Sequence, residues 1–369
     1  MTVIVSKKVM FVVSSLMGAG HLQRILLIAR AVNAAGGRAV VVSGGRPISH
    51  LIGAGIEVKN LPPVWSDGVD YSKLYTPDGL ASDTYLEQRA RQLCNLFDLH
   101  KPDVLVTELF PFGRRTLALE YTTLLEHAAG KARIYASIRD VLEPKKKAKR
   151  HAETATHLRR WYDGVLVHGD QAVVGLDATW PLAPEFTDRL HYTGYVCQAP
   201  VEPIQTDEVL VAVGGGVIGR ALLRAAVEAA RESDRPWRLR VGGADADLVI
   251  AALHQKAQGA PVVIEPAAAD YRARLAGCAC SVSLFGYNTA TDLMLAGCPA
   301  VISPMDEGGE REQIIRADAF GMVPRFVRLP KVTPEQLRDA IEQALKAVDQ
   351  GSFPIALDGA SQSAKVLMR

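Results

Sequence analysis

Short apolar runs alternate with helical stripes along this chain of 369 residues. The runs are rich in β-branched residues and end at glycine-containing turns, as buried strands of a parallel sheet do. In the first half, the predicted strands are 9–13, 38–43, 104–107, 134–137 and 164–168. Between the first two, apolar residues recur at helical spacing from Leu22 to Ala35. With right-handed crossovers, this alternation predicts a doubly wound α/β fold.

The same plan starts again after a polar, proline-containing stretch at residues 198–207. The predicted strands of the second half are 208–213, 237–241, 261–264, 280–283 and 300–303. The chain is also too long for one typical domain. We therefore expect two Rossmann-like doubly wound domains, and a tail able to pack back on the first of them. The expected boundaries are 1–195, 196–355 and 356–369.

Composition and charge narrow the classes of function. Hydrophobic residues make up 48% of the chain and charged residues 22%, as in globular proteins that bury a core. The net charge is +2, and the basic run at 145–150 is interpreted as a solvated face, so no nucleic-acid partner is expected. An anionic membrane surface is the alternative partner for that run. The five cysteines lack metal-ligand spacing and favour a reducing cytoplasm.

The first glycine turn places a histidine at the start of the following helix. Gly18 and Gly20 flank the turn, and His21 follows it. Ligands of doubly wound sheets bind at the carboxyl ends of the strands, and histidine titrates near neutral pH. We therefore predict that His21 is a general base at the edge of a cleft. A locally hydrogen-bonded helix-start histidine is the alternative.

Two further charged pairs follow strands of the first half. Glu108 with Arg114, and Arg139 with Asp140, could bind an acceptor or a phosphate. A structural ion pair is the alternative for each. His168 ends an apolar strand and is expected to be buried and hydrogen-bonded rather than catalytic.

A glycine pattern opens the second half. Gly214, Gly216 and Gly219 have the Gly-x-Gly-x-x-Gly spacing between a strand and a helix. A dinucleotide site also needs an acidic residue at the end of the next strand, and that strand ends Arg240-Val-Gly-Gly243. The missing acid argues against NAD and leaves phosphate binding, or a structural turn.

The segment from Phe285 to Asp292 predicts a turn that opens onto a short helix. Free backbone N–H groups at a helix start bind anions, which favours a diphosphate near Asn288 and Thr289. Thr289 and Thr291 could offer hydroxyls to that phosphate or cap the helix. Asp292 could accept hydrogen bonds from ribose hydroxyls, or be a first-turn acid that favours the helix dipole. Glu312 and Gln313 could reach a sugar, or simply begin a solvated helix.

These motifs together resemble the GT-B glycosyltransferases of family 28. That family includes the UDP-N-acetylglucosamine transferase of peptidoglycan synthesis, and the resemblance is greatest to uncharacterised bacterial predicted glycosyl transferases related to it. The resemblance spans nearly the whole chain and is strongest at residues 18–24, 107–115 and 286–313. It implies two domains that face a cleft, with the acceptor on the N-terminal domain and the donor nucleotide on the C-terminal domain.

Individual positions follow from the resemblance. It implies that Asp292 binds the ribose, Gln313 the donor sugar, and Gly215 and Gly216 the diphosphate, with His21 as the base. The chain departs from the family in three places. The first turn differs before its histidine, the ribose acid is aspartate rather than glutamate, and the diphosphate loop lacks its serine.

The resulting hypothesis is an inverting transfer from a nucleoside-diphosphate sugar, with a UDP-sugar as the expected donor. No bound metal or further cofactor is expected, because the resemblance implies a GT-B site that can work without one. The acceptor is a small molecule or a lipid-linked compound. We expect a cytoplasmic protein, in peripheral contact with the inner membrane if the acceptor is a lipid. A nucleotide-sugar hydrolase or epimerase is the first alternative, because the Gly-x-Gly-His-x-x-Arg turn also resembles a UDP-sugar hydrolase. A non-catalytic nucleotide-sugar-binding protein is the second.

Overall fold

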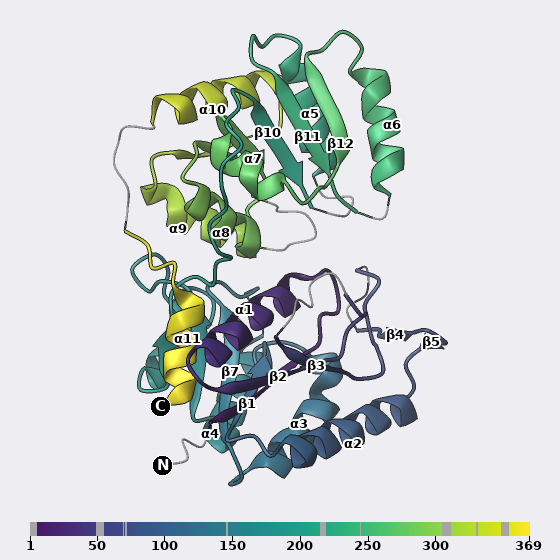
Figure 1. Cartoon of the computed structure of the whole chain (residues 1–369), viewed down its shortest axis with the longest axis vertical. Helices are drawn as coiled ribbons and strands as arrows, with labels where there is room; N and C mark the ends of the chain where they lie inside the picture. The colour runs from purple at the N-terminus through teal and green to yellow at the C-terminus, as the bar shows by residue number, and fades with distance from the viewer. Residues whose placement is uncertain are drawn as a thin grey trace. The chain divides into compact units, whose positions relative to one another are not determined.

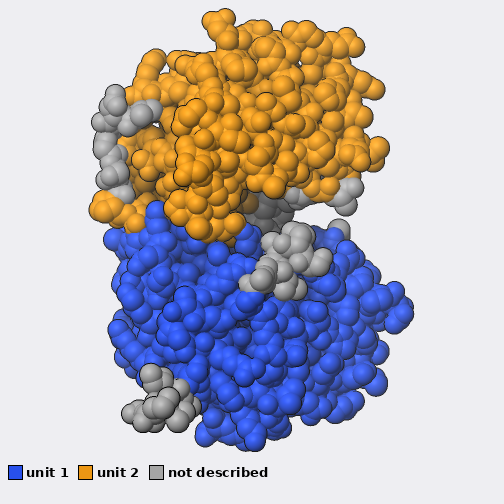
Figure 2. All heavy atoms as spheres, viewed as in Figure 1, with its two compact units in different colours: residues 1–197, 356–369 blue, residues 198–355 orange. Residues whose placement is uncertain are grey.

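The chain forms two compact units, which Figure 2 distinguishes by colour. Unit 1 comprises residues 1–197 and 356–369, and unit 2 comprises residues 198–355. This computed structural model describes residues 6–48, 55–68, 70, 72–144, 147–214, 219–243, 245–304, 311–329, 331–347 and 354–369. The boundary thus falls two residues after the one expected from sequence, and the C-terminal residues belong to unit 1.

Unit 1 is built on a seven-stranded parallel sheet with the order β3-β2-β1-β6-β7-β8-β9. Its strands are β1 (Lys8–Val13), β2 (Arg38–Ser43), β3 (Glu57–Asn60), β6 (Val104–Glu108), β7 (Arg133–Arg139), β8 (Gly164–His168) and β9 (Leu190–Tyr192). All five predicted strands are present. β3 and β9 were not predicted, because these short edge strands have no fully buried residue and therefore no apolar run.

Helices cover both faces of this sheet (Figure 1). They are α1 (Gly20–Ala34), α2 (Asp83–His100), α3 (Ala118–Ala128), α4 (Ala148–Trp161) and α11 (Gly359–Met368), and a small hairpin, β4 (Tyr75–Thr76) and β5 (Gly79–Leu80), precedes α2. Alternate residues of β1 supply the two core layers. Val9 and Phe11 pack with α1 and α11, whereas Met10 and Val12 pack with residues of α2, α3 and α4.

Unit 2 repeats the plan with a six-stranded parallel sheet of order β12-β11-β10-β13-β14-β15. The strands are β10 (Val209–Val213), β11 (Trp237–Val241), β12 (Val262–Pro266), β13 (Cys280–Ser283), β14 (Ala300–Ile302) and β15 (Phe326–Arg328). The helices are α5 (Arg220–Ala230), α6 (Ala246–Lys256), α7 (Tyr271–Gly277), α8 (Tyr287–Ala296), α9 (Glu312–Ala319) and α10 (Pro334–Lys346). Thr333 caps α10 by accepting the Gln336 N–H at 3.3 Å.

The order of the strands confirms the doubly wound prediction. In each sheet the direction of winding reverses beside the first strand, between β1 and β6 in unit 1 and between β10 and β13 in unit 2. Ligands of such sheets bind at the carboxyl ends of the strands at this reversal. In unit 1, His21 follows β1 and Glu108 is the last residue of β6. In unit 2, the turn into α8 follows β13. The residues predicted from sequence therefore flank both reversal points.

A buried ion pair ties the helices of unit 1 to the loops after β2 and β3. The Arg89 Nε donates to Glu120 Oε2 at 2.8 Å and its Nη2 donates to Oε1 at 3.1 Å, and both side chains are fully buried. The Arg89 Nη1 also donates to the carbonyl oxygens of Gly44, at 3.1 Å, and of Pro62. One guanidinium therefore joins α2, α3 and two loops on the carboxyl side of the sheet.

Candidate functional site

The turn between β1 and α1 carries the predicted base. Gly18 lies in the left-handed region with φ of 60°, where a residue with a Cβ is strained. α1 begins at Gly20 without a side-chain cap, which leaves its first backbone N–H groups available for a ligand. His21 is the second residue of the helix, and its side chain is 17% exposed.

His21 is hydrogen-bonded to the last residue of β6. The distance from His21 Nδ1 to Glu108 Oε1 is 2.6 Å, and the Glu108 side chain is fully buried. The Arg24 Nη2, one helical turn after His21, donates to the same carboxylate oxygen at 2.7 Å. The Arg114 Nη2 lies 4.0 Å from Glu108 Oε2. A histidine, a carboxylate and two guanidiniums are thus brought together at the reversal point of unit 1.

The charges of this cluster determine which imidazole nitrogen carries the proton. Burial alone would raise the pKa of Glu108, but the interactions with His21, Arg24 and Arg114 hold it well below its usual range. Burial lowers the pKa of His21 to about 4, against the attraction of Glu108. Glu108 is therefore ionised and His21 neutral at pH 7. The carboxylate accepts the Nδ1–H, which leaves the Nε2 lone pair able to take a proton.

The other residues predicted for the acceptor lie on the same side of the sheet. Arg114 has a left-handed backbone with φ of 59°, and in the described structure its buried Nε and Nη2 have no hydrogen-bond partner. Arg139 ends β7, the strand beside β6. Asp140 is buried, and its Oδ1 accepts the Val141 N–H at 2.7 Å. Arg24 was not predicted as a site residue, although its spacing of three residues from His21 puts both on one helix face.

His168 is buried and hydrogen-bonded, as the sequence predicted. Its Nε2 lies 2.8 Å from the Ser137 Oγ, and its Nδ1 lies 3.0 Å from the Thr193 Oγ1. The Oγ of Ser363, on α11, is 3.5 Å from the same Nδ1. Burial lowers the pKa of His168 to about 3. This histidine is part of the core that joins β7, β8 and the C-terminal helix.

The low pKa of His168 predicts a loss of stability in acid. The unfolded chain takes up the proton at about pH 6.5, whereas the folded protein resists it until about pH 3. Between these values the unfolded state binds one more proton, so acidification lowers the free energy of unfolding by about 1.4 kcal/mol per pH unit. Urea titrations between pH 7 and pH 5 measure this slope. His168→Gln should reduce the slope by that amount, and an unchanged slope in the variant would contradict a buried neutral imidazole.

The start of α8 provides the corresponding anion site in unit 2. Gly286 is the N-cap and has no side chain, so the N–H groups of Tyr287, Asn288 and Thr289 form an uncapped helix N-terminus. The Thr291 hydroxyl is buried and donates to the Asn288 carbonyl oxygen at 2.8 Å. Of the two threonines, Thr289 is therefore the one better placed to offer its hydroxyl at the helix start.

Asp292 lies in the second turn of α8. It is the sixth residue of the helix, so the alternative interpretation as a first-turn acid is wrong. Its Oδ1 accepts a hydrogen bond from Arg272 Nε at 3.1 Å, and Arg272 Nη2 donates to the Ala199 carbonyl oxygen at 2.7 Å. Burial raises the pKa of Asp292 to about 6, although Arg272 acts in the opposite direction. No local pattern in the sequence points to Arg272, which lies on α7.

α9 fixes the turn that leads into α8. The Gln313 Oε1 accepts the Phe285 N–H at 2.9 Å, and the buried Arg316 Nη1 donates to the Phe285 carbonyl oxygen at 3.1 Å. Arg316 also pairs with Glu312 at 2.8 Å, one helical turn earlier. Gln313 thus binds the turn itself. Arg316 was not predicted as a site residue, although its spacing of four residues from Glu312 is the signal of a helical ion pair.

The predicted diphosphate residues Gly215 and Gly216 lie outside the described residues. Gly219, at the end of that turn, has φ of 95° and is the N-cap of α5. In the described ranges, no three His, Cys, Asp or Glu residues gather as metal ligands would. No helix within those ranges combines the length and apolarity needed to span a membrane.

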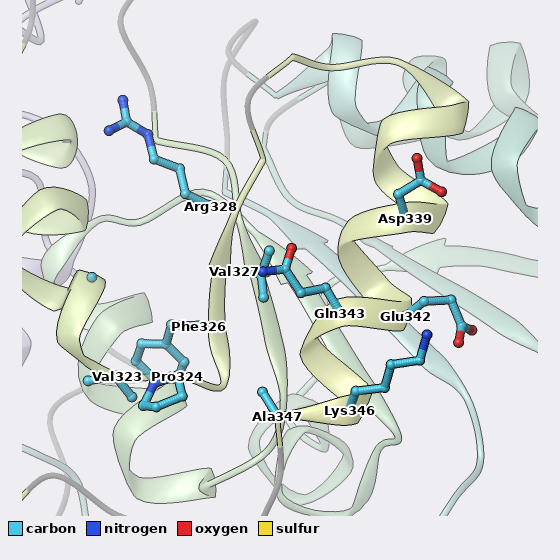
Figure 3. A pocket seen from close by; sticks show the side chains of 11 residues that line it. Val323, Pro324, Phe326, Val327, Arg328, Asp339, Glu342, Gln343, Lys346 and Ala347 are labelled. Atoms are coloured by element: carbon cyan, nitrogen blue, oxygen red, sulfur yellow. The ribbon is translucent and has the colours of Figure 1, made fainter. Parts of the chain in front are cut away.

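A separate cavity of about 910 Å³ lies beside the edge strand of unit 2. Figure 3 shows Asp339, Glu342 and Lys346 on α10 and Phe326 and Arg328 on β15 around it. None of the site residues predicted from sequence lines this cavity. We therefore do not assign this cavity as the functional site, despite its volume.

Solved structures match the fold along nearly the whole chain, whereas no protein family and no curated protein matches the sequence. One is a UDP-glucosyltransferase from Polygonum tinctorium, at 16% identity and a TM-score of 0.62, covering 99% of each chain. Another is MurG from Acinetobacter baumannii, at 15% identity and a TM-score of 0.59, covering 98% of this chain and 99% of that chain. The chain has the GT-B fold. A UDP-GlcNAc 2-epimerase from Methanocaldococcus jannaschii also matches, at 10% identity and a TM-score of 0.62, over 97% of this chain and 98% of that chain. At these identities the likeness shows the GT-B fold and leaves membership of family 28 as a hypothesis.

Proposed function

We propose that this protein is an inverting glycosyltransferase that moves a sugar from a UDP-sugar to an acceptor hydroxyl. The observation that carries the proposal is the hydrogen bond between His21 and Glu108 at the strand reversal of a GT-B unit. A neutral imidazole held by an ionised carboxylate is a general base with its Nε2 ready to accept a proton. A relation to the family 28 transferases is part of the same proposal.

His21 would activate the acceptor in one displacement. Its Nε2 takes the proton of the acceptor hydroxyl while the oxygen attacks the anomeric carbon of the donor. The new carbon–oxygen bond forms on the face opposite the diphosphate, and the bond between the anomeric carbon and the diphosphate oxygen breaks. The configuration inverts, the UDP leaves with the bonding electrons, and His21 later releases its proton to solvent. Glu108 holds the imidazole and stabilises its protonated form.

The donor would be bound by unit 2. The N–H groups at the start of α8, near Asn288 and Thr289, and the glycine turn at 214–219 would stabilise the diphosphate as its charge grows. Asp292 would accept hydrogen bonds from the ribose hydroxyls. Glu312 and Gln313 begin α9, beside the turn at Phe285, and are proposed to contact the donor sugar.

The acceptor would be bound by unit 1, where Arg114 and Asp140 lie on the same side of the sheet as the base. Gly18 and Gly20 would let its hydroxyl approach the backbone closely. A small molecule fits this proposal, and so does a lipid-linked acceptor, which would bring a cytoplasmic protein into peripheral contact with the inner membrane. The mechanism proposed here needs no metal.

Turnover of radiolabelled UDP-sugars, with and without a set of hydroxyl compounds, tests the proposal. A thermal-shift screen against UDP, GDP, ADP and dTDP first identifies the nucleotide, because a ligand that binds the folded state raises its Tm. Sugar transfer that requires the acceptor supports the transferase. Release of free sugar at a catalytic rate would instead establish a hydrolase, and interconversion of two UDP-sugars an epimerase. Stabilisation by UDP without any turnover would favour a binding protein.

Asp292 makes UDP binding dependent on pH. The pKa of its carboxyl is raised to about 6 by burial, and the ionised form is the better acceptor for ribose hydroxyls. About nine-tenths of the carboxyl is protonated at pH 5, so the Kd for UDP should rise about tenfold between pH 7.5 and pH 5. Calorimetry at both values measures the change.

The terminal phosphate of UDP also titrates near pH 6, so a baseline is needed. Asp292→Asn supplies it, because an amide does not titrate. We expect this variant to bind UDP about tenfold more weakly at pH 7.5. Its remaining pH dependence should be smaller than that of the wild type. The exposed Asp318→Asn on α9 is the matched control. Equal pH dependence in Asp292→Asn and wild type would remove the ribose role.

A further inference from the structure

A cavity of about 620 Å³ opens beside the turn that precedes His21. Its walls come from residues 15–19 after β1, residues 46–48 after β2, and residues 65–66. The volume lies in the range of about 300–1,000 Å³ that small-molecule sites occupy. Since Ala19 is followed directly by Gly20 and His21 at the start of α1, a ligand in this cavity would lie against the turn of the proposed base.

One wall presents a guanidinium ready to bind an anion. The Cζ of Arg46 lies 4.0 Å from the centroid of the Trp65 ring. Contact with the face of the indole restricts the guanidinium, and a guanidinium matches a carboxylate or a phosphate with two hydrogen bonds. Arg46 is exposed, and its one interaction within the described residues is the stacking on Trp65. Its charge is therefore not neutralised by any described carboxylate.

The remaining walls are apolar apart from two buried serines, Ser15 and Ser66. Leu16, Met17 and Ile48 line the cavity, and the Met17 side chain is 48% exposed. An exposed methionine offers an adaptable apolar surface to a ligand. Ser15 also lines the cavity and is only 6% exposed, and its Oγ has no hydrogen-bond partner in the described structure. A buried hydroxyl without a partner is costly, and a polar atom of a ligand would satisfy it.

We propose that this cavity binds the acceptor, and that the acceptor is a hydroxyl compound with an apolar body and one anionic group of the carboxylate or phosphate type. Arg46 binds the anionic group, Met17 and Ile48 contact the apolar body, and Ser15 hydrogen-bonds a polar atom of the ligand. The inference rests on the proposed function, because His21 is what makes a bound hydroxyl a nucleophile. It adds a specificity determinant, Arg46, that the pair of His21 and Glu108 alone does not supply.

Fluorescence titration of the full-length protein with 6-hydroxy-2-naphthoate, its methyl ester and 2-naphthyl phosphate tests this assignment. No nucleotide is added, so the result does not depend on turnover. We expect at least one of the two anions to bind tenfold or more tightly than the neutral ester, and the better anion identifies the group that Arg46 prefers. Equal affinity for all three probes, or binding of none, overturns the proposal.

Arg46→Gln assigns the preference to one side chain. This variant should remove the preference for the anion and leave the affinity for the methyl ester within about twofold. Trp65→Leu, which removes the stacking surface, should reduce the same preference. Arg91→Gln is the control, because Arg91 is an exposed arginine of α2 that pairs with Glu87. If Arg46→Gln binds the anion as the wild type does, the cavity is not the anionic site.

The probe titration and the sugar-transfer assay together separate this inference from the proposed function. Arg46-dependent binding of the anionic probe without any sugar transfer would leave the cavity assignment standing and remove the transferase. Sugar transfer together with probe binding that does not depend on Arg46 would support the transferase and contradict the assignment of this cavity.

Discussion

Replacing His21 by alanine should lower kcat by about 10²–10⁴-fold and leave the affinity for UDP unchanged. General base catalysis contributes about this factor, and the imidazole is the group placed to take the acceptor proton. The burial that lowers the pKa of His21 to about 4 keeps it neutral over the physiological range. The base must be neutral to act, so kcat/KM of the wild type for the acceptor, measured at saturating UDP-sugar, should rise with pH through about 4 and be level near pH 7. Steady-state kinetics with UDP calorimetry measure both quantities.

Two further variants make the test specific. His127→Gln changes another histidine that pairs with a carboxylate, Asp98 at 2.8 Å, on the surface of the same unit, and it should leave kcat unchanged. Glu108→Gln keeps the shape of the side chain but lets its amide donate to Nδ1, which favours the tautomer with the proton on Nε2. That tautomer cannot accept a proton, so this variant should also lose most of its activity. Wild-type turnover in His21→Ala would exclude the imidazole as the base.

Replacing Arg89 by methionine should lower the free energy of unfolding of unit 1 by about 3–5 kcal/mol. Removal of one partner from a buried ion pair leaves the other charge without compensation, and Glu120 is only 1% exposed. The change also removes two hydrogen bonds to the loops at Gly44 and Pro62. Urea unfolding monitored by circular dichroism at pH 7.5 gives the difference.

A double variant distinguishes the uncompensated charge from lost packing. Arg89→Met with Glu120→Leu removes both charges, and it should be more stable than Arg89→Met alone because no buried charge remains unpaired. Arg91→Met breaks an exposed pair with Glu87 on the same helix and should cost less than about 1 kcal/mol. A loss below about 1 kcal/mol in Arg89→Met would show that Glu120 finds other compensation.

Much of the architecture could be predicted because its signals are local. Burial on both faces of a parallel sheet requires continuous apolar sequence, so a few consecutive residues are enough to identify β1 and β10. The apolar stripe of α1 is also visible within one short segment. The glycines that end these strands mark the turns, and Thr333 with Pro334 marks the start of α10. The edge strands β3 and β9 could not be predicted in this way, because neither has a fully buried residue and the sequence has no apolar run there. β15 was missed because it is only three residues long, although Phe326 and Val327 are buried.

Several site candidates were also visible locally, but their partners were not. The sequence places His21 after a glycine turn, yet its hydrogen-bond partner Glu108 is 87 residues away on another strand. It places Asp292 on a short helix, yet Arg272 on α7 holds its carboxylate. It offers Gln313 as a sugar ligand, but it does not reveal the hydrogen bond in which the Gln313 carbonyl oxygen accepts the Phe285 N–H.

Local sequence was enough to predict most of the succession of strands and helices, the repeat of one plan in two halves, and the residues at the carboxyl ends of the strands. Which of these residues meet, and in which ionisation state, follows from the folded structure alone. Hydrophobic periodicity reports on neighbours along the chain, whereas parallel strands pair residues that are far apart in it. The pairing of β1 with β6 brings His21 to Glu108. Burial then gives the imidazole its low pKa, whereas the interactions with His21, Arg24 and Arg114 keep the carboxylate ionised despite its burial.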